Sequence, residues 1–180
     1  MNIDFKHLDD LASVWCEWAE MEIRQDQYDR ALLTLKEAVK EPARAQRLLQ
    51  KKENDSRAPT TERIYKSTKV WSLYLDLEES LGDISSTRAA YERVLALKVA
   101  TPQIILNYAA FLEENKYFEE SFRVYEKGVS AFGFPHAKDI WTNYLTKFVA
   151  RYKGTKLERV YVLACARFNV LILMVGTGSI

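Results

Sequence analysis

The sequence is poor in the residues that break helices. Its 180 residues include 6 glycines and 4 prolines, too few for a turn-rich β fold or for a long disordered chain. Hydrophobic residues make up 48% of the chain, which is ample for a folded core. This composition excludes a mainly disordered protein and favours a helical one.

Residues that carry catalytic or metal chemistry are also scarce. The 2 cysteines, Cys16 and Cys165, lack the spacing of a disulfide or metal framework and are interpreted as buried thiols. The 2 histidines, His7 and His136, have no Cys, Ser or carboxylate at the spacing of a triad or a metal site. We therefore expect no catalytic residue, no metal and no cofactor, so the protein is not predicted to be an enzyme.

The sequence shows neither a strong net charge nor the pattern that we expect of a secretion signal. The formal net charge is +1, so no global field attracts the chain to nucleic acid or to a membrane. The first ten residues carry Asp4, Lys6, Asp9 and Asp10 and no apolar run, unlike a secretion signal. These features favour a reducing, intracellular compartment.

A pair of amphipathic helices is predicted between Val70 and Leu97. Apolar residues recur there at three- and four-residue steps, which places them on one face of a helix. The first helix carries Trp71, Tyr74, Leu77 and Leu81, and the second carries Ile84, Thr87, Arg88, Tyr91, Val94 and Leu95. Gly82-Asp83 separates them as a turn. Because each helix has a single apolar stripe, we expect an antiparallel hairpin.

The same pattern recurs along the chain. Trp71-x2-Tyr74 returns first as Ile105-x2-Tyr108 and then as Trp141-x2-Tyr144, and Trp15-x2-Trp18 stands upstream at a wider interval. A period of about 35 residues with two helices per unit is typical of an α-helical solenoid, whereas a plain bundle needs no equal spacing. The residues expected to pack inside the hairpins are Trp15, Trp18, Trp71, Tyr74, Tyr91, Tyr108, Tyr125, Trp141 and Tyr144.

Other helix boundaries follow from capping signals. Asp9 or Asp10 is expected to begin the first helix, which runs to about Arg24. Its apolar residues, all expected to face inward, are Leu11, Val14, Trp15, Trp18 and Met21. Thr101-Pro102 predicts a later helix start, with Thr as the N-cap and Pro at the first helical position.

Residues 44–69 form a basic segment. Eight basic and three acidic residues give it a local charge of +5, and Lys51–Thr61 within it is polar enough to be a mobile insertion. Arg44, Arg47, Lys51 and Lys52 are candidate contacts for RNA phosphate or for an acidic protein. Tyr65 is the one aromatic residue of the segment, so a base-stacking platform is missing. A solvated loop is the preferred interpretation.

Two pairs of carboxylates, Glu78-Glu79 and Glu113-Glu114, lie near predicted helix ends. General acid–base catalysis would require a pocket and a raised pKa. We favour the alternative that these glutamates are solvated or hydrogen-bond between helices.

The chain ends in an apolar stretch, Val160–Val175, whose only charge is Arg167. This stretch is shorter than the roughly 20 residues that a membrane helix needs. We therefore expect no membrane anchor and treat residues 160–180 as a tail outside the repeats.

The central hairpin resembles a half-a-TPR (HAT) repeat. The pattern of Trp71, Tyr74, Leu77 and Glu78, followed by the AAYERVL of 89–95, carries this resemblance. A tetratricopeptide repeat would have a small residue at position 75 and alanine at position 87. This chain has Leu75 and Thr87 instead, which favours the HAT pattern.

Longer stretches are similar to consecutive HAT repeats of the SYF family of pre-mRNA-splicing factors, which includes the XPA-binding protein of animals. These stretches are 11–24, 69–83, 101–132 and 139–159, and the likeness covers about Phe5 to Arg159. There the family would continue with an Ala-Arg-x-x-Phe-Glu helix, whereas Val160-Tyr161-Val162-Leu163 stands here. Residues 1–159 are therefore expected to form about four hairpins of a longer family pattern.

The resemblance implies an all-α, right-handed superhelical solenoid that acts as a nuclear scaffold. It implies a place in the NineTeen-type complex of the spliceosome, a role in pre-mRNA splicing and, for the animal members, in transcription-coupled DNA repair. The implied partners are other splicing-complex proteins, with RNA contacted indirectly and without a small-molecule substrate or cofactor. The alternative is an RNA-binding helical-repeat protein that uses the basic 44–69 segment.

Overall fold

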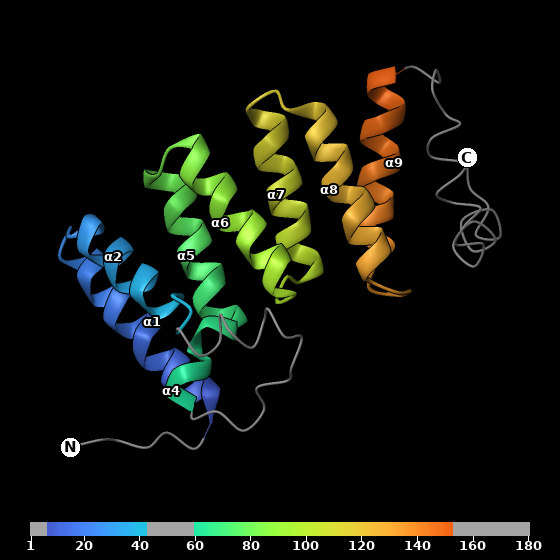
Figure 1. Cartoon of the computed structure of the whole chain (residues 1–180). Helices are drawn as coiled ribbons and strands as arrows, with labels where there is room; N and C mark the ends of the chain where they lie inside the picture. The colour runs from blue at the N-terminus through green and yellow to red at the C-terminus, as the bar shows by residue number, and fades with distance from the viewer. Residues whose placement is uncertain (1–6, 43–59, 153–180) are drawn as a thin grey trace. The chain divides into compact units, whose positions relative to one another are not determined.

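A computed structural model describes residues 7–42 and 60–152 of the chain, and within these ranges it contains helices and no strand (Figure 1). The elements are α1 (Leu8–Arg24), α2 (Tyr28–Ala38), α4 (Thr60–Arg63), the 3₁₀ helix η1 (Ile64–Lys66), α5 (Thr68–Leu81), α6 (Ile84–Leu97), α7 (Pro102–Glu114), α8 (Phe118–Ala131) and α9 (Lys138–Tyr152). The all-α fold expected from the repeat pattern is thereby confirmed. Arg44, Arg47, Lys51, Lys52 and the 160–180 tail lie outside the described residues.

The chain divides into two compact units, residues 1–100 and residues 101–180. In the first unit α1 and α2 form one hairpin and α5 and α6 form the next, and α5 packs against both α1 and α2. In the second unit α7 and α8 form a hairpin, and α9 packs against both of its helices. In each unit, therefore, a hairpin packs against the first helix of the hairpin that follows it.

Turn chemistry sets the ends of these helices. The Asp83 carboxylate accepts a hydrogen bond from the Ser86 amide at 2.7 Å and so caps α6, and Thr101 Oγ1 caps α7 by accepting from the Ile104 amide at 3.3 Å. Pro102 occupies the first turn of α7 as the sequence predicts. Helix α7 ends just before Lys116, whose backbone is in the left-handed region at φ 67°. The next amide, that of Tyr117, donates a hydrogen bond to the Leu112 carbonyl at 2.8 Å.

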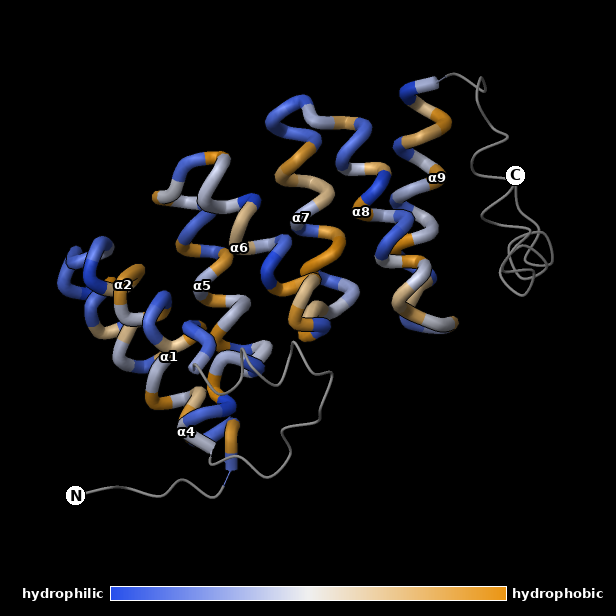
Figure 2. Tube along the Cα trace, viewed as in Figure 1, coloured by the Kyte–Doolittle hydropathy of each residue, from blue (hydrophilic) through white to orange (hydrophobic). Residues whose placement is uncertain are grey.

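The core of the first unit is built around Trp71. Its side chain is 2% exposed, and its indole Nε1 donates to the Tyr65 carbonyl at 2.7 Å. Tyr65 itself lies in η1 and is buried, so this bond ties the short segment before α5 to α5 itself. Figure 2 shows hydrophobic and hydrophilic residues alternating along these helices, as expected for helices that bury one face.

The core of the second unit is an aromatic cluster between α8 and α9. Phe122 lies 5.1 Å from Phe148 by ring centroids, and Tyr125 stacks on Tyr144 at 5.8 Å. Gly128 of α8 permits this close approach, because a Cβ there would lie 2.6 Å from Ile105 Cγ2 and 3.3 Å from Ile140 Cδ1. A helix-interior glycine, normally unfavourable, is here required by packing.

Helix α1 differs from the expectation. Trp18 is 48% exposed, Val14 47% and Met21 46%, although all three were predicted to face inward. The buried residues of α1 are instead Leu11, Ala12, Cys16 and Ala19. These four residues lie on the face of α1 that packs against the other helices of its unit. Val14, Trp18 and Met21 lie on another face, which is turned to solvent. Trp15 is half-buried and stacks on Trp18 at 5.6 Å.

Candidate interaction surface

Most of the aromatic residues singled out in the sequence are inside the units. Trp71, Tyr74, Tyr91, Tyr108, Tyr125, Trp141 and Tyr144 are all buried. Each of these side chains is at most 6% exposed, so most of its surface packs against the rest of its unit. The two others differ: Trp15 is half-buried, and Trp18 offers nearly half of its surface to solvent.

Three of the four paired glutamates, Glu78, Glu79 and Glu113, hydrogen-bond between helices. Tyr91 of α6 donates its hydroxyl to Glu79 of α5, and one repeat later Tyr125 of α8 donates to Glu113 of α7 at 3.2 Å. Ser121 Oγ also donates to Glu113, at 2.9 Å. The same polar contact therefore joins the two helices of both hairpins, as expected for glutamates that hydrogen-bond between helices.

Glu78 has a comparable role and is almost completely buried. It accepts hydrogen bonds from the Tyr74 hydroxyl and from Ser86 Oγ, both at 2.7 Å. Burial, and secondarily the hydrogen bond to Glu78, raises the pKa of Tyr74 above its ordinary value. Burial and then the Glu113 carboxylate raise the pKa of Tyr125 in the same direction. Both tyrosines therefore stay protonated as donors at neutral pH.

Further polar contacts join successive hairpins within a unit. Arg93 of α6 pairs with Glu41, which follows α2, and Glu41 is almost completely shielded from solvent. Lys147 of α9 pairs with Glu113 of α7, and the Tyr144 hydroxyl donates to Glu126 of α8 at 2.9 Å. Glu113 thus accepts donors from its own hairpin and from the following helix.

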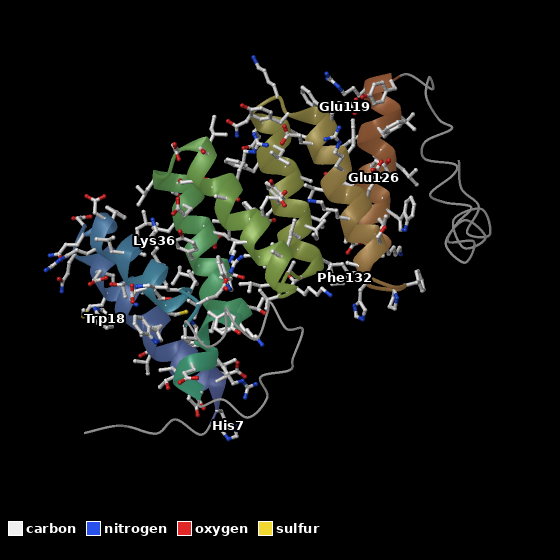
Figure 3. The ribbon with its side chains drawn as sticks, viewed as in Figure 1. His7, Trp18, Lys36, Glu119, Glu126 and Phe132 are labelled. Atoms are coloured by element: carbon white, nitrogen blue, oxygen red, sulfur yellow. The ribbon has the colours of Figure 1, made fainter. Side chains whose placement is uncertain are left out.

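A groove in the first unit is lined by residues of α2, α5 and α6. Trp71 and Tyr74 contribute to its wall, Glu41 and Glu78 supply acidic groups, and its basic residues are Lys36, Lys40 and Arg93. Lys40 pairs with Glu37 at 3.0 Å and Arg93 with Glu41, so the charges largely compensate one another. Lys36 of α2 is an exposed cation that borders the groove (Figure 3).

A second groove lies in the second unit, where α8 begins and α9 ends. Its wall includes Lys116, Tyr117, Phe118, Glu119 and Arg151. The Arg151 guanidinium lies 3.6 Å from the centroid of the Phe118 ring. Both grooves mix apolar, acidic and basic groups. Such a lining suits a polypeptide better than the uniformly negative backbone of a nucleic acid.

The described part of the chain has neither a metal-binding cluster nor a membrane-spanning helix. Residues 7–42 and 60–152 contain no group of three His, Cys, Asp or Glu side chains placed to hold a metal ion. No described helix is both long and apolar enough to cross a membrane. Cys16 is buried, as the sequence predicts, and this burial raises the pKa of its thiol.

The comparison with known protein families agrees with the repeat pattern. A family model described as the pre-mRNA-splicing factor Syf1/CRNKL1 C-terminal HAT repeat matches residues 1–164. Pre-mRNA-splicing factor SYF1 of Homo sapiens is 55% identical over 157 residues, which is 87% of this chain and 18% of the relative.

Relatives from two other organisms match this chain over a similar length. Pre-mRNA-splicing factor SYF1 of Mycosarcoma maydis is 54% identical over 88% of this chain and 14% of the relative. Pre-mRNA-splicing factor cwf3 of Schizosaccharomyces pombe is 48% identical over 88% of this chain and 20% of the relative. The chain therefore spans no more than about a fifth of the length of these relatives. Its helical hairpins, their spacing and these identities show that the chain belongs to the Syf1/CRNKL1 family of HAT-repeat pre-mRNA-splicing factors.

Proposed function

We propose that the chain acts in the nucleus as a protein–protein scaffold in pre-mRNA splicing. In this proposal residues 1–159 form the repeat array and bind other splicing proteins, as in a NineTeen-type complex. A role in transcription-coupled DNA repair is the further possibility implied by animal family members. The proposal assigns no catalytic residue and no cofactor.

The mixed polarity of the two grooves is the observation that carries this proposal. Lys36, Lys40 and Arg93 share the lining of one groove with Glu41 and Glu78, beside the apolar wall formed by Trp71 and Tyr74. Protein interfaces combine an apolar centre with polar groups of both signs. The family membership independently supports splicing proteins as the partners.

Capture from nuclear extract tests the proposal. The full chain, immobilised, should retain splicing proteins after nuclease treatment, and mass spectrometry identifies them. Lys36→Glu should weaken this retention if the groove of the first unit is used, whereas Lys138→Glu, an exposed cation at the start of α9, serves as the matched control. Loss of all splicing proteins upon nuclease treatment would contradict the scaffold role.

The alternative is direct RNA binding through the basic segment, which its local charge of +5 supports. This alternative expects RNA affinity that falls steeply with salt. It also expects that affinity to disappear when Arg44, Arg47, Lys51 and Lys52 are replaced by glutamine. Binding that survives these replacements would exclude it.

A further inference from the structure

The charged groups that line the groove of the first unit differ in their exposure to solvent. Its two carboxylates, Glu41 and Glu78, are almost completely buried. Its three cations are all exposed, namely Lys36, Lys40 and Arg93. The face that this groove offers to another molecule is therefore positive, although its lining contains charges of both signs.

Both buried carboxylates are engaged inside the unit. Glu78 accepts the two hydrogen bonds from α5 and α6 described above. Glu41 pairs with Arg93 through Oε1, whereas its Oε2 is buried and has no donor in residues 7–42 and 60–152. Arg93 is thus the cation that compensates Glu41, and this pair holds the guanidinium at the groove.

The exposed cations keep donors available for a second partner. A guanidinium has five N–H donors, and the side chain of Arg93 remains 49% exposed while it pairs with Glu41. Lys36 forms no hydrogen bond or ion pair within the part of the chain that the structure describes. Lys40 pairs with Glu37 on the surface, where both side chains are about two-thirds exposed, and such a pair contributes little and exchanges readily.

Small apolar side chains lie among these cations. Val39, Ala89 and Ala90 line the groove, and of these Ala89 is exposed. Trp71 and Tyr74 are at most 6% exposed, so their rings give a nucleic-acid base no surface to stack on. The groove has a volume of about 430 Å³, which suits a few side chains and is too small for a whole helix.

We infer that this groove binds a short acidic segment of a partner polypeptide, in which carboxylates flank an aliphatic side chain. One carboxylate pairs with the exposed edge of the Arg93 guanidinium, whose planar fork matches a carboxylate. A second carboxylate pairs with Lys36, and the aliphatic side chain lies on Ala89. This inference rests on the proposed function, because it names the chemistry of the partner that the same groove would bind.

Selection from a displayed library of short random peptides tests the inference. The immobilised full chain should enrich peptides that combine aspartate or glutamate with leucine, isoleucine or valine. The most enriched peptide, synthesised with a fluorescent label, then gives a dissociation constant by fluorescence anisotropy. Its affinity should fall as salt is added, because the contacts are between exposed charges.

Neutral variants of the groove identify the contacts. Lys36→Gln should weaken binding of the selected peptide by about threefold, as expected for an exposed ion pair. Arg93→Gln alone would leave Glu41 buried without its cation, so it is combined with Glu41→Gln. This double variant should weaken binding by about tenfold or more, because it removes the forked contact.

Lys138→Gln is the matched control, since Lys138 is an exposed lysine of the second unit, and it should bind like the unchanged chain. Thermal melting followed by circular dichroism checks that each variant is folded. A folded double variant that binds the selected peptide as tightly as the unchanged chain would overturn the inference. Enrichment of peptides without acidic residues, or of none at all, would overturn it as well.

A labelled oligouridylate is the second probe. If it binds more tightly than the selected peptide and the groove variants weaken it, the occupant is a nucleic acid and the inference is wrong. Capture from nuclear extract separates this inference from the proposed function. Splicing proteins retained by a chain that selects no acidic peptide would refute the inference alone, whereas selection of acidic peptides without retained splicing proteins would refute the role in splicing alone.

Discussion

At the residue scale, Trp71 is a large buried side chain that joins α5 to η1 in the first unit. It is buried, it lies edge-on to Tyr74 with ring centroids 5.7 Å apart, and its indole nitrogen bonds to the backbone of η1. Removing the ring therefore leaves a cavity and also leaves the Tyr65 carbonyl without this donor. Trp18, by contrast, has the same side chain in a half-exposed place.

We expect Trp71→Ala to lower the free energy of unfolding by about 3–5 kcal/mol, because a large buried ring is lost. Trp18→Ala should lower it by about 1 kcal/mol or less, since nearly half of its surface stays exposed after folding. Urea denaturation followed by circular dichroism measures both. A cost below about 1 kcal/mol for Trp71→Ala would be inconsistent with its place in the core.

The buried tyrosines predict a loss of stability at high pH. The folded state holds the pKa of Tyr74 and Tyr125 above the ordinary value of 10.0. Folding therefore opposes ionisation, so this contribution to stability is complete below pH 10 and is lost as the pH rises above it. Tyr125→Phe should cost about 1 kcal/mol at neutral pH through the lost hydrogen bond, and it should make the alkaline loss shallower.

Urea midpoints at neutral and strongly alkaline pH test this expectation. Tyr28→Phe is the matched control, because Tyr28 is exposed and its hydroxyl is 3.5 Å from the Asp26 carboxylate. If Tyr125→Phe and Tyr28→Phe show the same pH dependence, the buried hydroxyl does not govern the alkaline transition.

At the element scale, the fit of α8 between α7 and α9 depends on Gly128. In most helices Gly→Ala stabilises by roughly 1 kcal/mol. Here the added Cβ would come within 2.6 Å of Ile105 Cγ2, a distance that forces helices or side chains to move. We expect the free-energy cost of this steric clash to exceed the gain in helix propensity from alanine.

We therefore expect Gly128→Ala to destabilise the chain by about 1–3 kcal/mol, the usual cost of overpacking. Gly133→Ala is the matched control, since a Cβ at Gly133 would meet no atom within 4 Å. Thermal melting of both variants decides the matter. A higher melting temperature for Gly128→Ala would show that Ile105 of α7 can move away from the added Cβ without a net cost.

Many element boundaries could be predicted from local signals. The Gly82-Asp83 turn and the Thr101-Pro102 start act through capping chemistry, which the neighbouring residues alone determine. The exposure of Val14 and Trp18 could not be predicted in this way, because an apolar stripe reveals that a face can be buried and not whether a neighbour covers it. The bond from Trp71 to Tyr65 also escaped prediction, since it depends on how η1 folds back toward α5.

The hydrogen bonds between helices and the two grooves were less predictable than the hairpins. Glu79 and Tyr91 have the same spacing as Glu113 and Tyr125 in the next repeat, and that repetition could have revealed the shared hydrogen bond. The grooves combine residues from several helices, as Lys36, Trp71 and Arg93 do in the first unit. No local sequence pattern links such residues.

At the scale of the whole molecule, the segment between the two hairpins of the first unit predicts a site of proteolysis. Lys51, Lys52 and Arg57 lie in a polar stretch outside the described residues, whereas Arg93 is held in an ion pair on α6. Exposed polar segments are the preferred sites of proteolytic cleavage. Limited trypsin digestion should therefore cut at Lys51, Lys52 or Arg57 first. Mass spectrometry identifies the cut, and initial cleavage inside α5 to α9 would refute the expectation.

The Glu113 carboxylate couples the stability of the hairpin formed by α7 and α8 to the presence of α9. It accepts donors from Ser121 and Tyr125 of its own hairpin and from Lys147 of the following helix. If α9 detaches, Glu113 loses a cation from a largely buried position, and the remaining hairpin is weakened as well. Unfolding that begins at α9 should therefore spread into α7 and α8 as one cooperative event, and a shortened chain that lacks Lys147 should retain a hairpin less stable than its own contacts suggest.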